Sequence, residues 1–284
     1  MKIGKGSCNG TFGELVQGVL DERPFLVTLP IPALKSEAKF IPNLESPGLI
    51  GPAGKTKAVT ACKKLLERYE IKCGGTLVIE SNILVGKGMA SSSADIVAAI
   101  RAVADSFDLQ ITEEIISEIA IGIEPTDGVM YQDVVAYDHI NGRLIEKLGK
   151  MPDFTIVGLD FGDVVDTVQF NKIYKNYSIG DRKRFHEAYE MLRMGIKDQN
   201  FTLIYRASTI SAQINQKILT KPYFAEFERL AKRFNGGVVI AHSGTVMGLL
   251  LSSGNPKIDD VFHEVSLRFS NQSFRLVNTT FVKT

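Results

Sequence analysis

The sequence has 284 residues, enough for one large domain or two modest ones. It contains 33 Lys and Arg against 32 Asp and Glu, so the net charge of +1 lacks the basic excess that nucleic-acid binders usually carry. A hydrophobic content of 44% with 23% charged residues excludes disordered, collagen-like and coiled-coil classes and favours a globular protein with a real core.

The cysteines, the histidines and the hydropathy pattern indicate the cellular compartment and whether a metal site or a membrane span is expected. Cys8, Cys62 and Cys73 form no CxxC pair, and their odd number favours free thiols in a reducing cytoplasm. The four histidines lack metal-site spacing, so no transition-metal site is expected. No apolar run approaches the roughly 18 residues of a membrane span, and the N-terminus lacks a signal-peptide core. We therefore expect a cytoplasmic protein that binds neither nucleic acid nor membrane.

In chain order, the first half of the sequence mixes strand and helix patterns. A loop rich in proline and glycine is predicted at 42–54. Apolar residues recur at helical spacing from 55 to 69. Strands are predicted at 15–20, 24–29 and 76–81, further helices at 94–107 and 112–121, and a hairpin across 138–141.

A second unit is expected to begin near residue 150, which divides the chain into 1–150 and 151–284. Its predicted strands are 154–160, 236–241, 246–251 and 273–282, and its predicted helices are 181–196, 199–213, 222–234 and 257–269. The order of strands and helices has no regular βαβ period. This favours an α+β fold over a doubly wound parallel sheet.

The stretch from Val85 to Asp95, VGKGMASSSAD, carries the strongest chemical signal. It follows a predicted strand and opens a helix, whose N-terminal N–H groups and dipole attract anions. Serine hydroxyls there can cap the helix, donate to phosphate oxygens or coordinate Mg²⁺, and Lys87 adds positive charge. The residues of this predicted phosphate loop are Gly86, Lys87, Gly88, Met89, Ala90, Ser91, Ser92 and Ser93.

Other interpretations of glycine-rich segments fit less well. A serine-capped helix after a glycine turn would give the same pattern with no ligand. A dinucleotide-binding fingerprint needs a third glycine where Ser91 stands. A Walker-type loop needs four residues between its outer glycines, whereas Gly48 and Gly54 are separated by five and follow no strand.

Three segments in order resemble the signatures of the GHMP small-molecule kinases. Residues 88–94, GMASSSA, resemble the second signature, PxxxGLGSSAA, with Leu84, Ala90 and Ser93 as departures. Residues 7–18, SCNGTFGELVQG, resemble the first signature. Residues 236–249, GGVVIAHSGTVMGL, resemble the third, a glycine-rich turn between strands.

Within that superfamily the sequence looks most like the L-threonine kinases of cobalamin synthesis and propanediol utilisation. It shares with them a GKGMASS loop at 86–92 and an EPTD segment at 124–127. A YDH stretch at 137–139 and a VDT stretch at 165–167 are further points of similarity.

The resemblance implies a fold and an activity. The implied fold is α+β: an N-terminal GHMP kinase domain at 1–150, like domain 2 of ribosomal protein S5 and carrying the ATP phosphate loop, and a ferredoxin-like C-terminal domain at 151–284. The implied activity is ATP- and Mg²⁺-dependent phosphorylation of L-threonine to O-phospho-L-threonine, which feeds the aminopropanol phosphate branch of cobalamin synthesis. Two alternatives stay open: another small hydroxylated acceptor such as homoserine, and a relative that binds a nucleotide or metabolite without catalysis.

The resemblance also implies roles for individual residues. Ser92 and Glu124 are expected to hold Mg²⁺, because the family pairs a serine of its second signature with a downstream glutamate. Asp127 is expected to accept the proton of the acceptor hydroxyl or to orient that hydroxyl. The expected substrate-binding residues are Glu14, Asp166, Ser243 and Gly244.

Overall fold

The computed structural model describes residues 1–162, 176–269, 273–277 and 280–283. Its strands are β1 (Gly4–Leu20), β2 (Arg23–Asn43), β3 (Leu49–Ile50), β4 (Gly74–Ser81), β5 (Val134–Asp138), β6 (Arg143–Gly149), β7 (Phe154–Asp160), β8 (Gly237–Ile240), β9 (Val246–Ser252), β10 (Ser273–Val277) and β11 (Thr280–Lys283). Its helices are α1 (Thr56–Arg68), α2 (Ser91–Ser106), α3 (Glu113–Ile121), α5 (Ile179–Lys197), α6 (Phe201–Asn215), α7 (Phe224–Phe234) and α8 (Ile258–Arg268).

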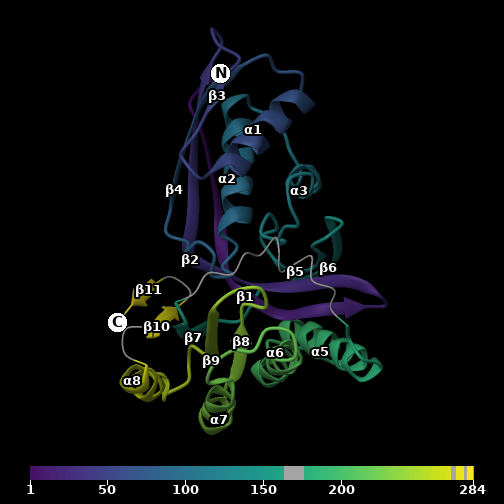
Figure 1. Cartoon of the computed structure of the whole chain (residues 1–284), viewed down its shortest axis with the longest axis vertical. Coiled ribbons are helices and arrows are strands. Elements are labelled where there is room, and N and C mark those ends of the chain that lie inside the picture. Colours follow the sequence, from purple (N-terminus) through teal and green to yellow (C-terminus); the bar gives the residue numbers. More distant parts are fainter. Residues whose placement is uncertain (163–175, 270–272, 278–279, 284) are drawn as a thin grey trace.

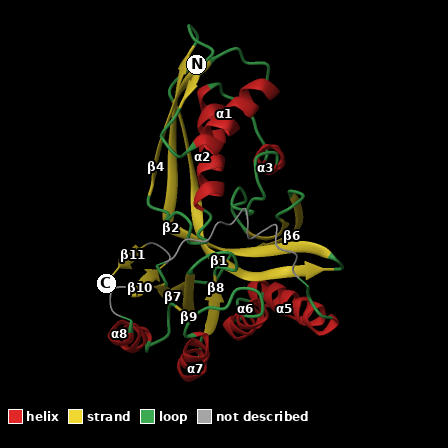
Figure 2. Ribbon diagram, viewed as in Figure 1, coloured by secondary structure: helices red, strands yellow, loops and turns green. Residues whose placement is uncertain are grey.

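The described strands join in one sheet whose order is β11-β10-β7-β9-β8-β1-β2-β4-β3, and β5 and β6 branch from β2. β1 and β2 are long enough to belong to both halves of the molecule (Figure 1). Helices α1, α2 and α3 lie beside them in the upper half of Figure 2, and α5 to α8 lie in the lower half. None of the described helices combines the length and apolar character that crossing a membrane requires.

Helix α2 forms the centre of the N-terminal half because it is buried on nearly every side. Its sequence, SSSADIVAAIRAVADS, is rich in alanine, which lets neighbouring elements approach closely. Gly6 of β1 makes one of these close approaches: a Cβ on Gly6 would lie 2.2 Å from the carbonyl oxygen of Ala98. The missing side chain therefore sets the distance between β1 and the helix that begins at the predicted phosphate loop.

Replacing Gly6 with alanine is expected to lower the free energy of unfolding by about 1–3 kcal/mol, because the added methyl overpacks a backbone contact that has no flexible side chain to move. Denaturant-induced unfolding measures this difference. Gly254→Ala is the matched control, since its Cβ would meet only the Ser252 hydroxyl, at 3.8 Å. Equal stability of the two variants would contradict the packing argument.

Most of the predicted elements are confirmed, with shifted ends. β1 and β2 extend well beyond the predicted 15–20 and 24–29. The prediction of a single strand at 273–282 is wrong, because β10 and β11 pair with each other as antiparallel strands. The boundary near residue 150 stays a prediction; β6 ends at Gly149 and β7 begins at Phe154.

Candidate active site

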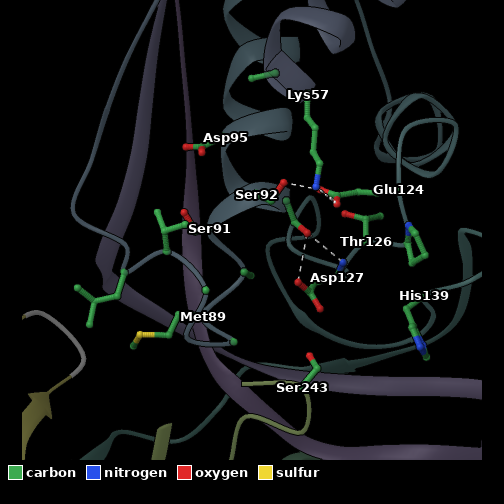
Figure 3. A pocket seen from close by; sticks show the side chains of 18 of the residues that line it. Lys57, Met89, Ser91, Ser92, Asp95, Glu124, Thr126, Asp127, His139 and Ser243 are labelled. Carbon is green, nitrogen blue, oxygen red and sulfur yellow. Dashed lines mark hydrogen bonds and ion pairs between the residues drawn. The ribbon is translucent and has the colours of Figure 1, made fainter. Parts of the chain in front are cut away.

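The N-terminus of α2 opens at a cavity of about 330 Å³ (Figure 3). The cavity collects residues that are far apart in the sequence. Three segments form most of its wall: 54–58 at the start of α1, 84–93 except Lys87 before and within α2, and 124–127. The remaining lining residues are Glu14, Gln17, Leu26, Asp95, His139 and Ser243.

The loop before α2 has a backbone suited to an anion. Gly86, Gly88 and Ala90 all have positive φ angles, of 73°, 78° and 59°. Ala90 occupies the N-cap position and offers no side-chain oxygen to the helix. The end of α2, where N–H groups lack intrahelical partners, therefore points at the cavity without a serine or aspartate cap. A left-handed alanine costs about 1–2 kcal/mol, a strain that is typical of functional loops.

The segments that resemble the first and third signatures hold this loop in place. The Thr11 N–H donates to the Met89 carbonyl at 3.1 Å, and the Thr245 N–H donates to the Lys87 carbonyl at 3.2 Å. A Cβ on Gly244 would lie 2.1 Å from the Lys87 carbonyl oxygen, so glycine is required at that contact. The three segments predicted to act together do lie together in the structure.

Two neighbouring serines of α2 bind two carboxylates of the EPTD segment. The Ser92 hydroxyl donates to Glu124 Oε1, and Lys57 Nζ donates to Glu124 Oε2 at 2.5 Å. The Ser93 hydroxyl lies 3.2 Å from Asp127 Oδ2, and the Asp127 N–H donates to Ser93 Oγ at 3.3 Å. These contacts, drawn as dashed lines in Figure 3, fix both carboxylates beside the helix end.

The carboxyl group of Asp127 is electrostatically unusual. Burial, and after it the charge of nearby Glu14, raise its pKa to about 7 against the opposing effect of the hydrogen bond from Ser93. A carboxylate with a pKa near neutrality can accept a proton more readily than an ordinary aspartate. Asp127 therefore has the properties of a general base at the wall of the cavity.

Glu14 is buried and held by the third-signature segment. Its Oε2 accepts hydrogen bonds from the His242 N–H at 2.8 Å and from His242 Nδ1 at 3.0 Å, and His242 Nε2 lies 2.7 Å from the Ser211 hydroxyl. Lys221, also buried, donates to the Gly244 carbonyl, and burial lowers its pKa to about 8. This network joins β1 to the turn between β8 and β9.

The structure places most of the predicted site residues in this cavity. Its wall includes Glu14, Gly86, Gly88, Met89, Ala90, Ser91, Ser92, Ser93, Glu124, Asp127 and Ser243. The Lys87 side chain instead pairs with Asp160 at 3.1 Å and donates to the Gly162 carbonyl. Gly244 contacts the loop rather than the cavity, and Asp166 lies outside the described residues.

Two lysines of the cavity carried no functional signal in the sequence. Lys57 belongs to the first turn of α1 and pairs with Glu124. Lys55 directly precedes α1, and its Nζ lies 2.5 Å from Asp95, which also accepts a hydrogen bond from Ser36. Tertiary contact between the starts of α1 and α2 brings both lysines to the site, and no local pattern encodes that contact.

The donor set fits Mg²⁺ bound together with a polyphosphate. Mg²⁺ prefers hard oxygens and takes few ligands from protein, the rest from phosphate and water. The Ser92 hydroxyl and the Glu124 carboxylate supply two such oxygens beside the helix end. Among the described residues, no three His, Cys, Asp or Glu side chains gather as a metal cluster. The chemistry of the pair thus suits an ion shared with a bound nucleotide.

Comparison with known proteins shows which family this chain is similar to. Residues 56–137 match the family model "GHMP kinases N terminal domain". The L-threonine kinase of Salmonella typhimurium is 26% identical over 255 residues, which cover 88% of this chain and 83% of that protein. The chain thus carries a GHMP kinase N-terminal domain over residues 56–137. GHMP kinases take the phosphoryl group from ATP, so the predicted phosphate donor is that of the family.

A second relative is similar in sequence, and two solved structures are similar in fold. The L-threonine kinase of Citrobacter freundii is 28% identical over 183 residues, which span 64% of each protein. A homoserine kinase from Cytophaga hutchinsonii superposes on the whole chain, and over 96% of its own, with a TM-score of 0.76 at 14% identity. Mevalonate kinase from L. major superposes over 97% of the chain with a TM-score of 0.67, also at 14% identity. The predicted α+β fold of the GHMP kinases is confirmed.

Proposed function

We propose that this GHMP kinase transfers the terminal phosphoryl group of ATP to the side-chain hydroxyl of L-threonine. The observation that carries the proposal is the pairing of Ser92 with Glu124 and of Ser93 with Asp127 at the N-terminus of α2. The pairing supports a site for phosphates, a divalent cation and a proton acceptor within one cavity. Phosphoryl transfer depends mainly on such positioning and charge stabilisation.

The helix end and its loop would bind the phosphates through backbone N–H groups. Ser92 and Glu124 would hold Mg²⁺, which neutralises phosphate charge and orients the phosphates. Glu124 presently accepts a hydrogen bond from Lys57, so the lysine is close enough to balance charge at the same place. These roles require no movement of Ser92, Glu124 or Lys57 from the positions that their hydrogen bonds give them.

Asp127 would accept the proton of the acceptor hydroxyl. An alcohol is a weak nucleophile, and a carboxylate within hydrogen-bond reach can take its proton as the new bond forms. Ser93 orients the Asp127 carboxylate, and the charge of Glu14 favours proton acceptance by it. The acceptor would therefore lie between Asp127 and the phosphates.

Threonine as the acceptor is supported by the two relatives named L-threonine kinase. The resemblance of the sequence to the L-threonine kinases of cobalamin synthesis implies that the product, O-phospho-L-threonine, is used to make the aminopropanol phosphate of cobalamin.

A panel of acceptors tests the proposal. The enzyme is incubated with ATP, Mg²⁺ and L-threonine, L-serine, L-homoserine or mevalonate, and the phosphorylated product is measured by phosphorus NMR. We expect the largest kcat/KM for L-threonine. A larger kcat/KM for homoserine would show that the protein is a kinase whose acceptor is homoserine instead of threonine. Tight ATP binding by calorimetry, with no product from any acceptor, would contradict the proposal and favour a non-catalytic relative.

A further inference from the structure

Gln17 projects from β1 toward the cavity because of its position in the strand. Successive side chains of a strand point to opposite faces. The next residue, Gly18, faces α5, since a Cβ there would lie 2.6 Å from the ring of Phe185. Gln17 therefore faces away from α5, in agreement with its place in the cavity wall.

The cross-strand neighbour of Gln17 reaches the same cavity. Gln17 of β1 lies opposite Leu26 of β2 in the antiparallel register. Directly opposite residues have Cβ atoms roughly 4.5–5.5 Å apart on one face, so their side chains act as a pair. Both residues line the cavity, one with an amide and one with an apolar side chain. The pair thus presents polar and apolar surface side by side.

The amide of Gln17 has an unused acceptor. The residue is only 5% exposed, and its Oε1 atom is buried with no hydrogen-bond partner among the residues that the structure describes. A buried polar atom without a partner is costly, and native proteins rarely keep one without a reason. At the wall of a cavity, a hydrogen-bond donor on a ligand supplies such a reason.

The charges around Gln17 favour a cationic donor. Glu14 and Asp127 line the same cavity, and the charge of Glu14 raises the pKa of Asp127. The cavity's lysines, Lys55 and Lys57, already pair with Asp95 and Glu124 near the start of α1. Figure 3 draws Lys57 and Ser243 on opposite sides of Asp127. Lys221, whose ammonium interacts with Glu14, is not part of the lining and donates to the Gly244 carbonyl. The charged groups that line the acceptor side are therefore the carboxylates of Glu14 and Asp127, which suit an ammonium group.

Leu26 adds a second preference. It is 2% exposed, so only a small part of its side chain meets the cavity. A methyl group on the acceptor that contacts Leu26 would be removed from water, and a single methyl or methylene in such a contact discriminates by roughly 10-fold or more. An amine and a methyl on neighbouring carbons would meet Gln17 and Leu26 together.

We propose that the cross-strand pair Gln17 and Leu26 selects the acceptor: Gln17 accepts a hydrogen bond from its ammonium group, and Leu26 packs against a methyl beside its hydroxyl. This proposal rests on the proposed phosphoryl transfer. It narrows the acceptor to small amines that carry a secondary alcohol with a methyl group on the hydroxyl-bearing carbon. Gln17 is a specificity residue here, distinct from the groups that bind phosphate or accept the proton.

The amine preference is tested with L-threonine and (R)-3-hydroxybutanoate, which lacks only the amine. Gln17→Leu is expected to lower kcat/KM for threonine by roughly 10- to 100-fold, the range for a hydrogen bond to a charged group, and to leave the value for hydroxybutanoate within threefold. Gln17→Glu should keep the preference for threonine. The control Gln110→Leu replaces an exposed glutamine outside the cavity and should change neither value. Equal losses for both acceptors in Gln17→Leu would overturn the role of Gln17.

The methyl preference is tested by a ratio within one preparation. Leu26→Ala is expected to lower the ratio of kcat/KM for threonine to that for serine by about tenfold. Because both acceptors are measured on the same protein, any loss of folded enzyme cancels from the ratio. An unchanged ratio would remove Leu26 from acceptor selection.

Titration calorimetry of the enzyme with threonine and with hydroxybutanoate separates this inference from the proposed function. Amine-selective binding that Gln17→Leu abolishes, without phosphoryl transfer, would keep the recognition pair and reject the kinase proposal. Efficient phosphorylation of an acceptor that has no amine would keep the kinase and reject the pair. Binding of threonine no tighter than hydroxybutanoate would likewise reject the pair.

Discussion

Replacing Asp127 with asparagine is expected to lower kcat by about 10²–10⁴-fold, the range for removing a general base. Asparagine keeps the shape of the side chain and the backbone contact with Ser93, so the change removes proton acceptance and little else. Single-turnover kinetics with ATP and saturating acceptor measure the chemical step directly. A loss under tenfold would show that Asp127 orients the hydroxyl without taking its proton.

The same residue predicts a pH dependence. The pKa of Asp127 is raised from 3.8 to about 7, so about half of the carboxyl groups are ionised at pH 7 and about one tenth at pH 6. The base form is the ionised one, so kcat/KM of the wild type should rise with pH and level off above about pH 8. In Asp127→Asn this limb should be absent. A limb that persists in the variant would assign the titration to another group.

Stability should respond with the opposite sign. The folded state holds a proton on Asp127 that the unfolded chain has released above about pH 4, so this group lowers the stability progressively from about pH 4 to about pH 7 and by a constant amount above that. Asp127→Asn removes that opposition and should raise Tm relative to the wild type more at pH 8 than at pH 5. Asp198→Asn, an exposed aspartate at the end of α5, is the control and should show no such difference. A variant that gains stability while its kcat falls indicates that the replaced buried charge serves function at a cost in stability.

The sequence predicted those parts of the site that depend on local patterns. Small residues and serines at the start of an alanine-rich helix are a local signal, although α2 begins at Ser91 rather than at the predicted 94, so the three serines belong to the helix itself. The apolar periodicity of α1 and the glycine-split strands β8 and β9 are likewise local, and they were predicted within a few residues. That the three signature segments lie close together was expected only from the resemblance to the GHMP kinases, since no local pattern in the sequence indicates it.

The parts that the sequence did not predict depend on contacts between distant segments. β1 begins at Gly4 because Gly4 and Gly6 fit against α2, and no alternation of apolar residues marks that stretch. Lys57 contributes to the cavity only because α1 starts beside Glu124. Gln17 lay inside a resembling segment, yet its unused acceptor atom becomes visible only when the strand register places it opposite Leu26. Tertiary geometry, not composition, makes these residues candidates.

Replacing Ser92 with alanine is expected to lower kcat by about 10²–10³-fold, comparable to the loss of one preorganised charge-stabilising group. The hydroxyl both contacts Glu124 and lies at the helix end proposed to hold the phosphates and Mg²⁺, so its loss should also raise the Mg²⁺ concentration that gives half-maximal rate. Ser253→Ala, which changes an exposed serine outside the cavity lining, is the matched control. Glu124→Gln should resemble Ser92→Ala, and the double variant should lose much less than the product of the two effects, because residues that act on one ion are not additive. A Ser92→Ala enzyme with an unchanged Mg²⁺ requirement and near wild-type rate would separate the helix end from catalysis, since the proposed function places the ion at this hydroxyl and this carboxylate together.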